Sequence, residues 1–218
     1  YLVFNAGYSD LARAETAGEA VRLGRLLVEL LPADAEAHGL LALMLLQESR
    51  RHARVAGDGS LVVLADQDRS LWDRDVIAEG VELLRRAVAL AQPGQYQLQA
   101  SIAACHALAP AHEATDWRSI VALYGALQRA TGSPVVELNR AVAIALSGRP
   151  EEASAILDTV AEELADYHAF HVARGDVAMR LGHRDAAHRA FTEAGRLAPT
   201  EQERRHLAER ATAARSAR

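Results

Sequence analysis

Two consecutive segments of this chain repeat each other at a shift of 34 residues, and few folds accommodate such a period. Residues 134–167 align with residues 168–201 without a gap. Small and apolar residues coincide in this register: Gly148 with Gly182, Ala153 with Ala187, and Leu157 with Phe191. A unit of this length buries its apolar face by stacking on the next unit, so the repeat predicts a continuous array.

The units of this array are expected to be helices. Apolar residues recur at the 3.6-residue spacing of an amphipathic helix, and the six prolines all fall between the stretches with this spacing. The predicted helices lie at about 15–31, 34–52, 71–91, 94–109, 116–131, 134–147, 150–163, 166–181, 184–197 and 200–214. Most links between them are short, so neighbouring helices are expected to pack antiparallel.

One link between predicted helices is long and has a different character. The stretch "RVAGDGSLVVLA", residues 54–65, has a Gly-rich centre followed by β-branched residues. Asp58 and Gly59 suit the two central positions of a type I′ turn, which both need a positive φ angle. We therefore expect one β-hairpin, at about residues 53–65, inserted between two helices.

The second repeat has the spacing of a tetratricopeptide repeat (TPR). It reads "ARGDVAMRLGHRDAAHRAFTEAGRLAP", and the matching residues are Gly175, Ala187, Phe191, Ala194 and Pro199. Small residues allow close helix contacts, Phe191 fills the space between paired helices, and Pro199 ends the unit. The expected fold is therefore all-α: a TPR-like solenoid of antiparallel helix pairs over residues 1–218 as one domain, with the inserted hairpin and a capping helix at about 200–214.

Composition excludes several classes of function. The formal net charge is −5, so no net basic field draws the chain to nucleic acid or to anionic lipid. Cys105 is the one cysteine, which fits a reducing cytoplasm. The longest apolar run, Leu40 to Leu46, is far too short to cross a membrane, and no signal peptide is expected. A cytoplasmic protein is expected.

The stretch "LADQDRSLWDRD", residues 64–75, is the strongest candidate for a site, through Asp66, Asp68, Arg69, Ser70, Trp72 and Asp73. An EF-hand is excluded, because the turn position that requires glycine would hold Leu71. Ser70 and Asp73 have the spacing of a capping box, and Asp66 or Asp68 could pair with Arg69. The stretch is therefore expected to be a structural clasp, which anchors the hairpin to the next helix with Trp72 covering it. A contact surface for a partner is the main alternative, and a Mg²⁺ ion held only by the carboxylates of Asp66 and Asp68 stays open as well.

No other residues make a convincing catalytic or metal site. His168 and His171 have a spacing that can bind a metal, but the sequence shows no third ligand nearby. Cys105 lies in an apolar helix face, which favours a buried structural thiol. No serine–histidine–acid set or carboxylate pair stands out. We expect no enzyme activity, no cofactor and no metal.

A groove is expected on the first helix of each repeat, where TPR proteins hold peptides. The corresponding positions are Val135, Leu138 and Val142, then Ala169, Val172 and Asp176. This set is mostly apolar and lacks the basic residues with which some TPR proteins clamp an acidic C-terminus. It could hold an amphipathic helix or another part of the same polypeptide.

Six stretches, in this order along the chain, resemble the C-terminal TPR extension of a group of bacterial extracytoplasmic-function (ECF) RNA polymerase sigma factors. They are "YLVFNAGYS", "GLLALMLL", "LADQDRSLWDRDVIAEG", "YQLQASIAACHA", "TDWRSIVALY" and "SPVVELNRAVAIA". The resemblance implies a regulatory, protein-binding domain in transcription initiation. Its partners would be upstream promoter-binding sigma regions of the same polypeptide, RNA polymerase, or both, with no direct DNA contact by this domain.

Two other functions stay open at this point. The chain could be a stand-alone TPR adaptor that binds a peptide partner. It could also be a small-molecule-binding or hydrolytic helical protein that uses its histidines and the acids of residues 66–73. An upstream reading frame that encodes sigma regions would favour the sigma-factor domain over the adaptor and over the small-molecule-binding or hydrolytic protein.

Overall fold

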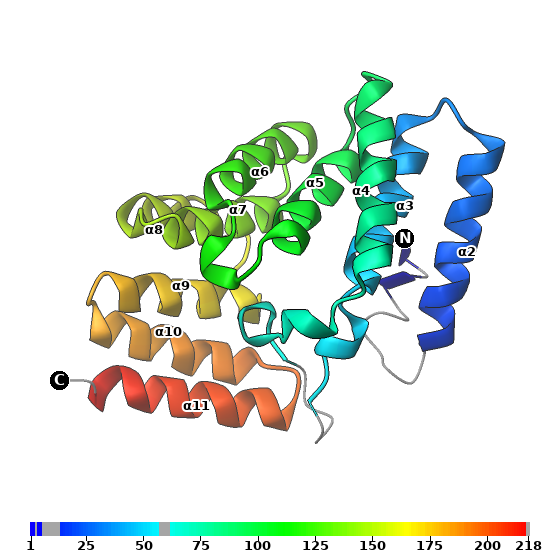
Figure 1. Ribbon diagram of the computed structural model, residues 1–218. Coiled ribbons are helices and arrows are strands. Elements are labelled where there is room, and N and C mark those ends of the chain that lie inside the picture. Colours follow the sequence, from blue (N-terminus) through cyan, green and yellow to red (C-terminus); the bar gives the residue numbers. More distant parts are fainter. Residues whose placement is uncertain (3, 6–13, 57–61, 217–218) are drawn as a thin grey trace. The chain divides into compact units, whose positions relative to one another are not determined.

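The computed structural model describes residues 1, 2, 4, 5, 14–56 and 62–216, which form two compact units, Tyr1–Ser119 and Ile120–Arg218 (Figure 1). The described part of the chain is all-helical. The N-terminal unit contains α2 (Ala14–Leu30), α3 (Ala35–Glu48), α4 (Arg74–Ala89), α5 (Gln95–Leu108) and the start of α6 (Trp117–Thr131). The C-terminal unit contains the rest of α6, then α7 (Pro134–Leu146), α8 (Pro150–Thr159), α9 (His168–Arg180), α10 (Arg184–Leu197) and α11 (Glu201–Ser216).

Helix α3 is the centre of the N-terminal unit, because it is apolar on nearly every side. Its residues Leu41 to Leu46 are each at most 2% exposed. Helices α2, α4 and α5 all pack against it. A helix that is apolar all round must be covered by neighbours, which explains why three helices surround α3.

Glu36 and Gly39 of α3 fix how α5 begins. The Glu36 carboxylate accepts hydrogen bonds from the backbone N–H groups of Tyr96 (2.9 Å) and Gln97 (3.1 Å). It thereby caps the first turn of α5, which has no capping side chain of its own. A Cβ atom on Gly39 would lie 2.8 Å from the Gln97 backbone nitrogen, so this close approach requires glycine.

The C-terminal unit has the periodicity that the sequence predicts. Helices α7 and α8 pack together, as do α9 and α10, and α11 packs on α10; Figure 1 shows α9, α10 and α11 side by side. Gly148 and Gly182 end equivalent helices at φ angles of 89° and 73°. Ala153 and Ala187 are both 0% exposed and occupy equivalent positions on α8 and α10.

The inserted β-hairpin is not supported. Among the described residues of the segment 53–65, Val55 forms an isolated bridge and there is no strand. One backbone hydrogen bond, from Val62 N–H to the Arg54 carbonyl (2.8 Å), joins the two arms. The chain then turns into a 3₁₀ helix at Leu64–Asp66, which interrupts any ladder, and the predicted turn at Asp58-Gly59 lies outside the described residues.

Three predicted helix ends differ from the structure by three or more residues. The helix expected to reach residue 52 ends at Glu48. The helix expected to begin at residue 71 begins at Arg74, because Asp73 occupies the N-cap. The helix expected to reach residue 163 ends at Thr159, and turns follow to residue 166. No helix in the described ranges is both long and apolar enough to cross a membrane.

Candidate functional site

The segment Asp66–Asp73 links α3 to α4 through two short 3₁₀ turns, Leu64–Asp66 and Arg69–Leu71. Its backbone is tied to the end of α3, since the Asp73 N–H donates to the Ser49 carbonyl at 2.9 Å. Asp66 and Asp68 are exposed, whereas Trp72 is only 3% exposed. The segment therefore buries Gln67 and Trp72, whereas its carboxylates face solvent.

Arg69 binds the C-terminus of α5 rather than an acid. Its Nη1 donates to the carbonyl oxygens of His106 (2.6 Å) and Ala109 (2.9 Å). Carbonyls in the last turn of a helix lack helical partners and carry partial negative charge, so a guanidinium satisfies them well. The predicted pairing of Arg69 with Asp66 or Asp68 is wrong, because both carboxylates lie on the exposed side of the segment.

The predicted capping box is also corrected. Asp73 alone caps α4, and its Oδ1 accepts from the N–H groups of Asp75 and Val76, both at 3.0 Å. Ser70 lies in the preceding 3₁₀ turn, where its N–H donates to Asp68 Oδ1 at 2.8 Å. Hydrogen bonds from the Ser70 side chain and backbone lower the pKa of Asp68.

Trp72 is covered by cations. The guanidinium carbon of Arg69 lies 4.5 Å from the centroid of the Trp72 ring, and that of Arg50 lies 5.9 Å from it. A cation over an indole face is an attractive contact that strengthens with burial. Trp72 and Arg69 thus connect the ends of α3 and α5 to the start of α4.

His106 lies beside this cluster as a neutral imidazole. Burial, followed by the charges of Arg50, Arg69 and His112, lowers its pKa from 6.5 to about 4. Its ring packs edge-on against Trp117 at a centroid distance of 5.4 Å. Near neutral pH it is therefore an uncharged packing residue.

The other residues considered from the sequence are placed as follows. His171 Nε2 lies 2.7 Å from the Ala165 carbonyl, and among the described residues no three His, Cys, Asp or Glu side chains gather where they could hold a metal. Cys105 is half-buried, and desolvation together with the charge of Asp116 raises the pKa of its thiol. A raised pKa leaves little of the reactive thiolate.

The predicted groove residues differ in how far they are exposed. Leu138 is 3% exposed and belongs to the core, Val142 and Val172 are partly buried, and Val135 is 38% exposed. Asp176 pairs with Arg210 of α11. The guanidinium of Arg210 also lies 4.1 Å from the centre of the Phe191 ring. Helix α11 therefore covers the part of the predicted groove around Asp176.

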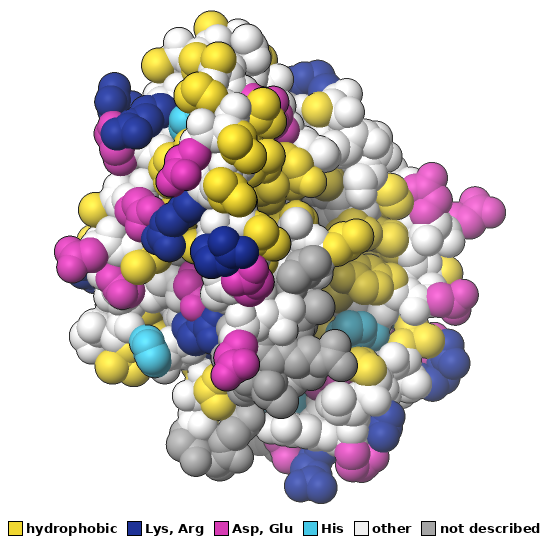
Figure 2. Space-filling view, turned by 90° about the vertical axis from the view of Figure 1, so that its right-hand side faces the viewer, with side chains coloured by type: hydrophobic (Ala, Val, Ile, Leu, Met, Phe, Trp, Pro, Cys, Tyr) yellow, Lys and Arg dark blue, Asp and Glu magenta, His cyan; other side chains and the backbone are white. Residues whose placement is uncertain are grey.

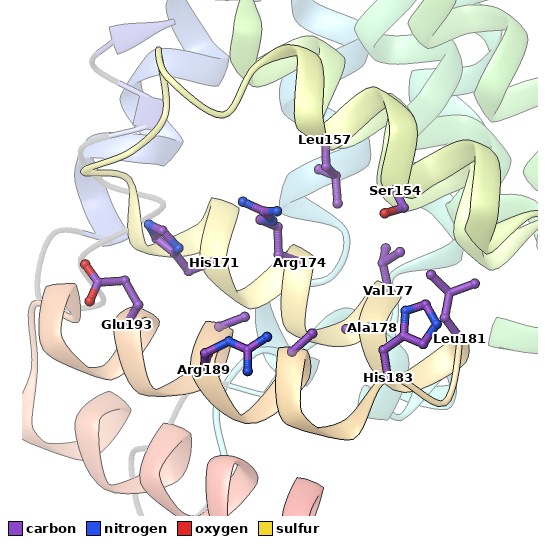
Figure 3. A pocket seen from close by; sticks show the side chains of 12 residues that line it. Ser154, Leu157, His171, Arg174, Val177, Ala178, Leu181, His183, Arg189 and Glu193 are labelled. Atoms are coloured by element: carbon purple, nitrogen blue, oxygen red, sulfur yellow. The ribbon is translucent and has the colours of Figure 1, made fainter.

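A cavity that the sequence did not indicate lies among α8, α9 and α10 (Figure 3). Its volume is about 300 Å³, and we call it the α8–α10 pocket. Its walls combine apolar, basic and acidic side chains: Ser154, Leu157, His171, Arg174, Val177, Ala178, Leu181, His183, Ala186, Arg189, Ala190 and Glu193. Sequence reasoning missed it because it considered the first helix of each pair, whereas α8 and α10 are second helices.

A second unpredicted feature is a row of leucines on the outer side of α2, which we call the α2 stripe. Leu23, Leu26 and Leu30 are 46%, 42% and 69% exposed. Figure 2, which views the side on which α2 lies, shows apolar side chains gathered on this face. Their i, i+3, i+7 spacing puts them on one side of the helix and could have been recognised in the sequence.

Comparison with known proteins gives two matches. Residues 1–88 match a family of unknown function, DUF6596. The chain is also 45% identical over 212 residues to a protein of Rhizobium meliloti (strain 1021) described as uncharacterized protein R00370. That match covers 95% of this chain and 50% of the relative, so the chain spans about half the length of the curated relative it matches. No solved structure matches the chain.

Proposed function

We propose that this chain is the regulatory, protein-binding domain of an ECF-type RNA polymerase sigma factor and acts in transcription initiation. Two things support the proposal. The six sequence stretches that resemble such sigma factors extend from Tyr1 to Ala145. The helix pairs α7–α8 and α9–α10 recur with the 34-residue period of TPR proteins, which bind other proteins.

The α2 stripe is the observation that carries a protein-binding role. The inner side of α2 packs on α3 through Ala17, Ala20 and Val21, which are at most 6% exposed. The outer leucines have no such cover among the described residues, and contiguous exposed apolar side chains usually mark a binding surface. The stripe therefore suits an apolar face of a partner.

We take that partner to be the upstream sigma regions of the same polypeptide. The matched relative is about twice as long as this chain, so half of it lies outside the match. Regions of one polypeptide meet at a high effective concentration, and a modest apolar stripe is then enough to hold them. RNA polymerase core is the alternative partner for the α2 stripe.

The test uses the upstream sigma regions, produced separately, and the 218-residue chain. Leu26→Ser combined with Leu30→Ser should weaken their association about tenfold or more, since two exposed leucines that the partner would cover are lost from the contact. Val88→Ser is the matched control, because Val88 is 61% exposed but lies on α4. Both variants should melt at the wild-type temperature.

Three outcomes would contradict parts of this proposal. Equal affinity of the double variant and the wild-type chain would remove the α2 stripe from the contact. Binding to polymerase core, with none to the sigma regions, would identify polymerase core as the partner of the α2 stripe. If the polypeptide that carries this chain contains no sigma regions and supports no promoter-dependent transcription with polymerase core, the sigma-factor assignment is wrong and the adaptor function replaces it.

A further inference from the structure

We propose that the α8–α10 pocket binds a small organic acid. Arg189 would hold the carboxylate, and Leu157, Val177 and Leu181 would contact its apolar part. All of the lining residues lie within the unit Ile120–Arg218, whereas the α2 stripe lies within Tyr1–Ser119. The inference therefore does not depend on the proposed role in transcription.

The shape of the pocket suits a small molecule. Its volume of about 300 Å³ is at the lower end of the roughly 300–1,000 Å³ typical of small-ligand sites. Side chains from three helices line it, and each helix belongs to a regular packed pair, so the walls are preformed. In Figure 3 His171 and Glu193 lie at one end, Leu181 and His183 at the other, and Arg174 and Arg189 between them.

The charges around the pocket leave one guanidinium uncompensated. Arg174 pairs with Asp158 at 3.1 Å, and Glu193 pairs with Arg196 at 2.7 Å. Arg189 lines the pocket with an exposed side chain, which donates no hydrogen bond to any residue that the structure describes. A guanidinium with free donors binds a carboxylate through two parallel hydrogen bonds. The polar part of the ligand is therefore an anion.

The apolar wall defines the rest of the ligand. Leu157 and Val177 are 2% and 3% exposed and form the inner wall, and Leu181 packs beside them. A purely inorganic anion could not use this wall, and a neutral apolar molecule could not use Arg189. An acid with a short aliphatic or aromatic chain uses both, and burial of that chain adds to the affinity.

The experiment is a titration of the 218-residue chain, followed by backbone amide NMR shifts. The probes are hexanoate, 4-phenylbutyrate, 4-phenylbutanol and inorganic phosphate. At least one acid should cause saturable shifts at amides of α8, α9 and α10. The alcohol and phosphate should bind at least tenfold more weakly than that acid.

Arg189→Gln tests the carboxylate contact and should lower the affinity for the acid about tenfold or more, as loss of a charge-assisted pair does. Arg184→Gln is the matched control: Arg184 is exposed on the same helix but does not line the pocket. Ala190→Leu narrows the pocket and should also weaken binding. None of the three should change the melting temperature by more than a few degrees.

The inference is overturned if neither acid gives saturable shifts in α8–α10. It is equally overturned if Arg189→Gln and Arg184→Gln lower the affinity to the same extent, or if the alcohol binds as tightly as the acid. Weaker binding of the acid to both Arg189→Gln and Ala190→Leu, with unchanged binding to Arg184→Gln, supports it.

Discussion

Arg69 shows how one side chain in the Asp66–Asp73 segment joins distant parts of the N-terminal unit. It donates to two carbonyls at the end of α5 and stacks on Trp72 just before α4. These are structural contacts, so the geometry favours a clasp over a free contact surface. Asp66, Asp68, Ser70, Leu71 and Asp73 are exposed, so this part of the segment remains accessible.

The first prediction concerns Arg69→Ala. The substitution removes two charge-assisted hydrogen bonds and leaves two carbonyls without partners, so it should lower the free energy of unfolding by about 2–3 kcal/mol. Urea denaturation measures this. In the full-length polypeptide, promoter-dependent transcription should fall in parallel with stability. Lost transcription with a wild-type denaturation curve would instead identify Arg69 as a partner contact.

The second prediction separates Asp73 from Ser70. Asp73→Ala removes the N-cap of α4 and should cost about 1 kcal/mol of unfolding free energy. Ser70→Ala should cost clearly less, because the Ser70 hydroxyl lies in the preceding 3₁₀ turn and does not cap α4. Thermal melts of the two variants compare these values. A larger loss for Ser70→Ala would restore the capping box expected from the sequence.

The third prediction concerns His106 and pH. Its pKa is 6.5 in model compounds and about 4 in the folded protein, mainly through burial. Between these values the unfolded chain binds a proton that the folded protein does not, so stability falls as the pH drops from 6.5 towards 4. At pH 5 this loss is on the order of 2 kcal/mol. His106→Gln should show a smaller loss between pH 7.5 and pH 5 in urea denaturation, and an unchanged loss would contradict it.

Part of this residue-scale chemistry could be predicted from the sequence and part could not. Asp73 is a typical N-cap residue, and Trp72 beside a helix start favours burial. The partners of Arg69 are carbonyls 37 and 40 residues further along the chain, and no local pattern reports them. Local spacing instead favoured the neighbouring acids, which face solvent.

At the scale of elements, the apolar periodicity of the sequence and the positions of the prolines locate the helices, because both depend only on residues close together in the chain. Pro134 and Pro150 each occupy the first turn of a helix, and the predicted starts of α7 and α8 coincide with them. The prediction of a β-hairpin was not supported, because a hairpin depends on contacts that are not local. A ladder depends on pairing between segments, and directly after the β-branched residues Val62 and Val63 the chain turns into a 3₁₀ helix at Leu64–Asp66.

The fourth prediction tests the contact between α9 and α10. A Cβ atom on Gly175 would lie 2.7 Å from Cζ of Phe191 and even closer to two other ring atoms. Gly175→Ala should therefore overpack this contact and lower the free energy of unfolding by about 1–3 kcal/mol. Gly18→Ala is the control, since a Cβ there meets nothing within 4 Å and the helix should gain about 0.5–1 kcal/mol. Equal effects of the two substitutions would mean that α9 and α10 are not so closely packed.

At the scale of the whole molecule, the sequence repeat and the two compact units have different extents. The 34-residue period belongs to α7–α10, within Ile120–Arg218. The unit Tyr1–Ser119 is organised around the apolar helix α3, and its links are longer. Repeat spacing therefore predicted the contacts of the C-terminal unit, but gave no information on Glu36 or Arg69, whose partners lie outside any repeat.

The fifth prediction is that the 218-residue chain does not bind duplex DNA appreciably at physiological salt. The net charge is −5, and many arginines pair with an acid three residues away on the same helix: Arg22 with Glu19, Arg85 with Glu82, and Arg204 with Glu201. Such pairs neutralise the guanidinium groups locally, so few phosphates could be contacted and few counterions released.

Fluorescence anisotropy with a labelled 30-base-pair duplex checks this prediction at 50 mM and 150 mM salt. The triple variant Glu19→Gln, Glu82→Gln, Glu201→Gln keeps every arginine but raises the net charge from −5 to −2, because each substitution removes one negative charge. If local pairing is what suppresses binding, this variant should bind weakly at 50 mM salt and lose that binding at 150 mM. Submicromolar, salt-sensitive binding by the wild-type chain would show that it carries a basic surface of its own, and DNA would then join the proposed partners.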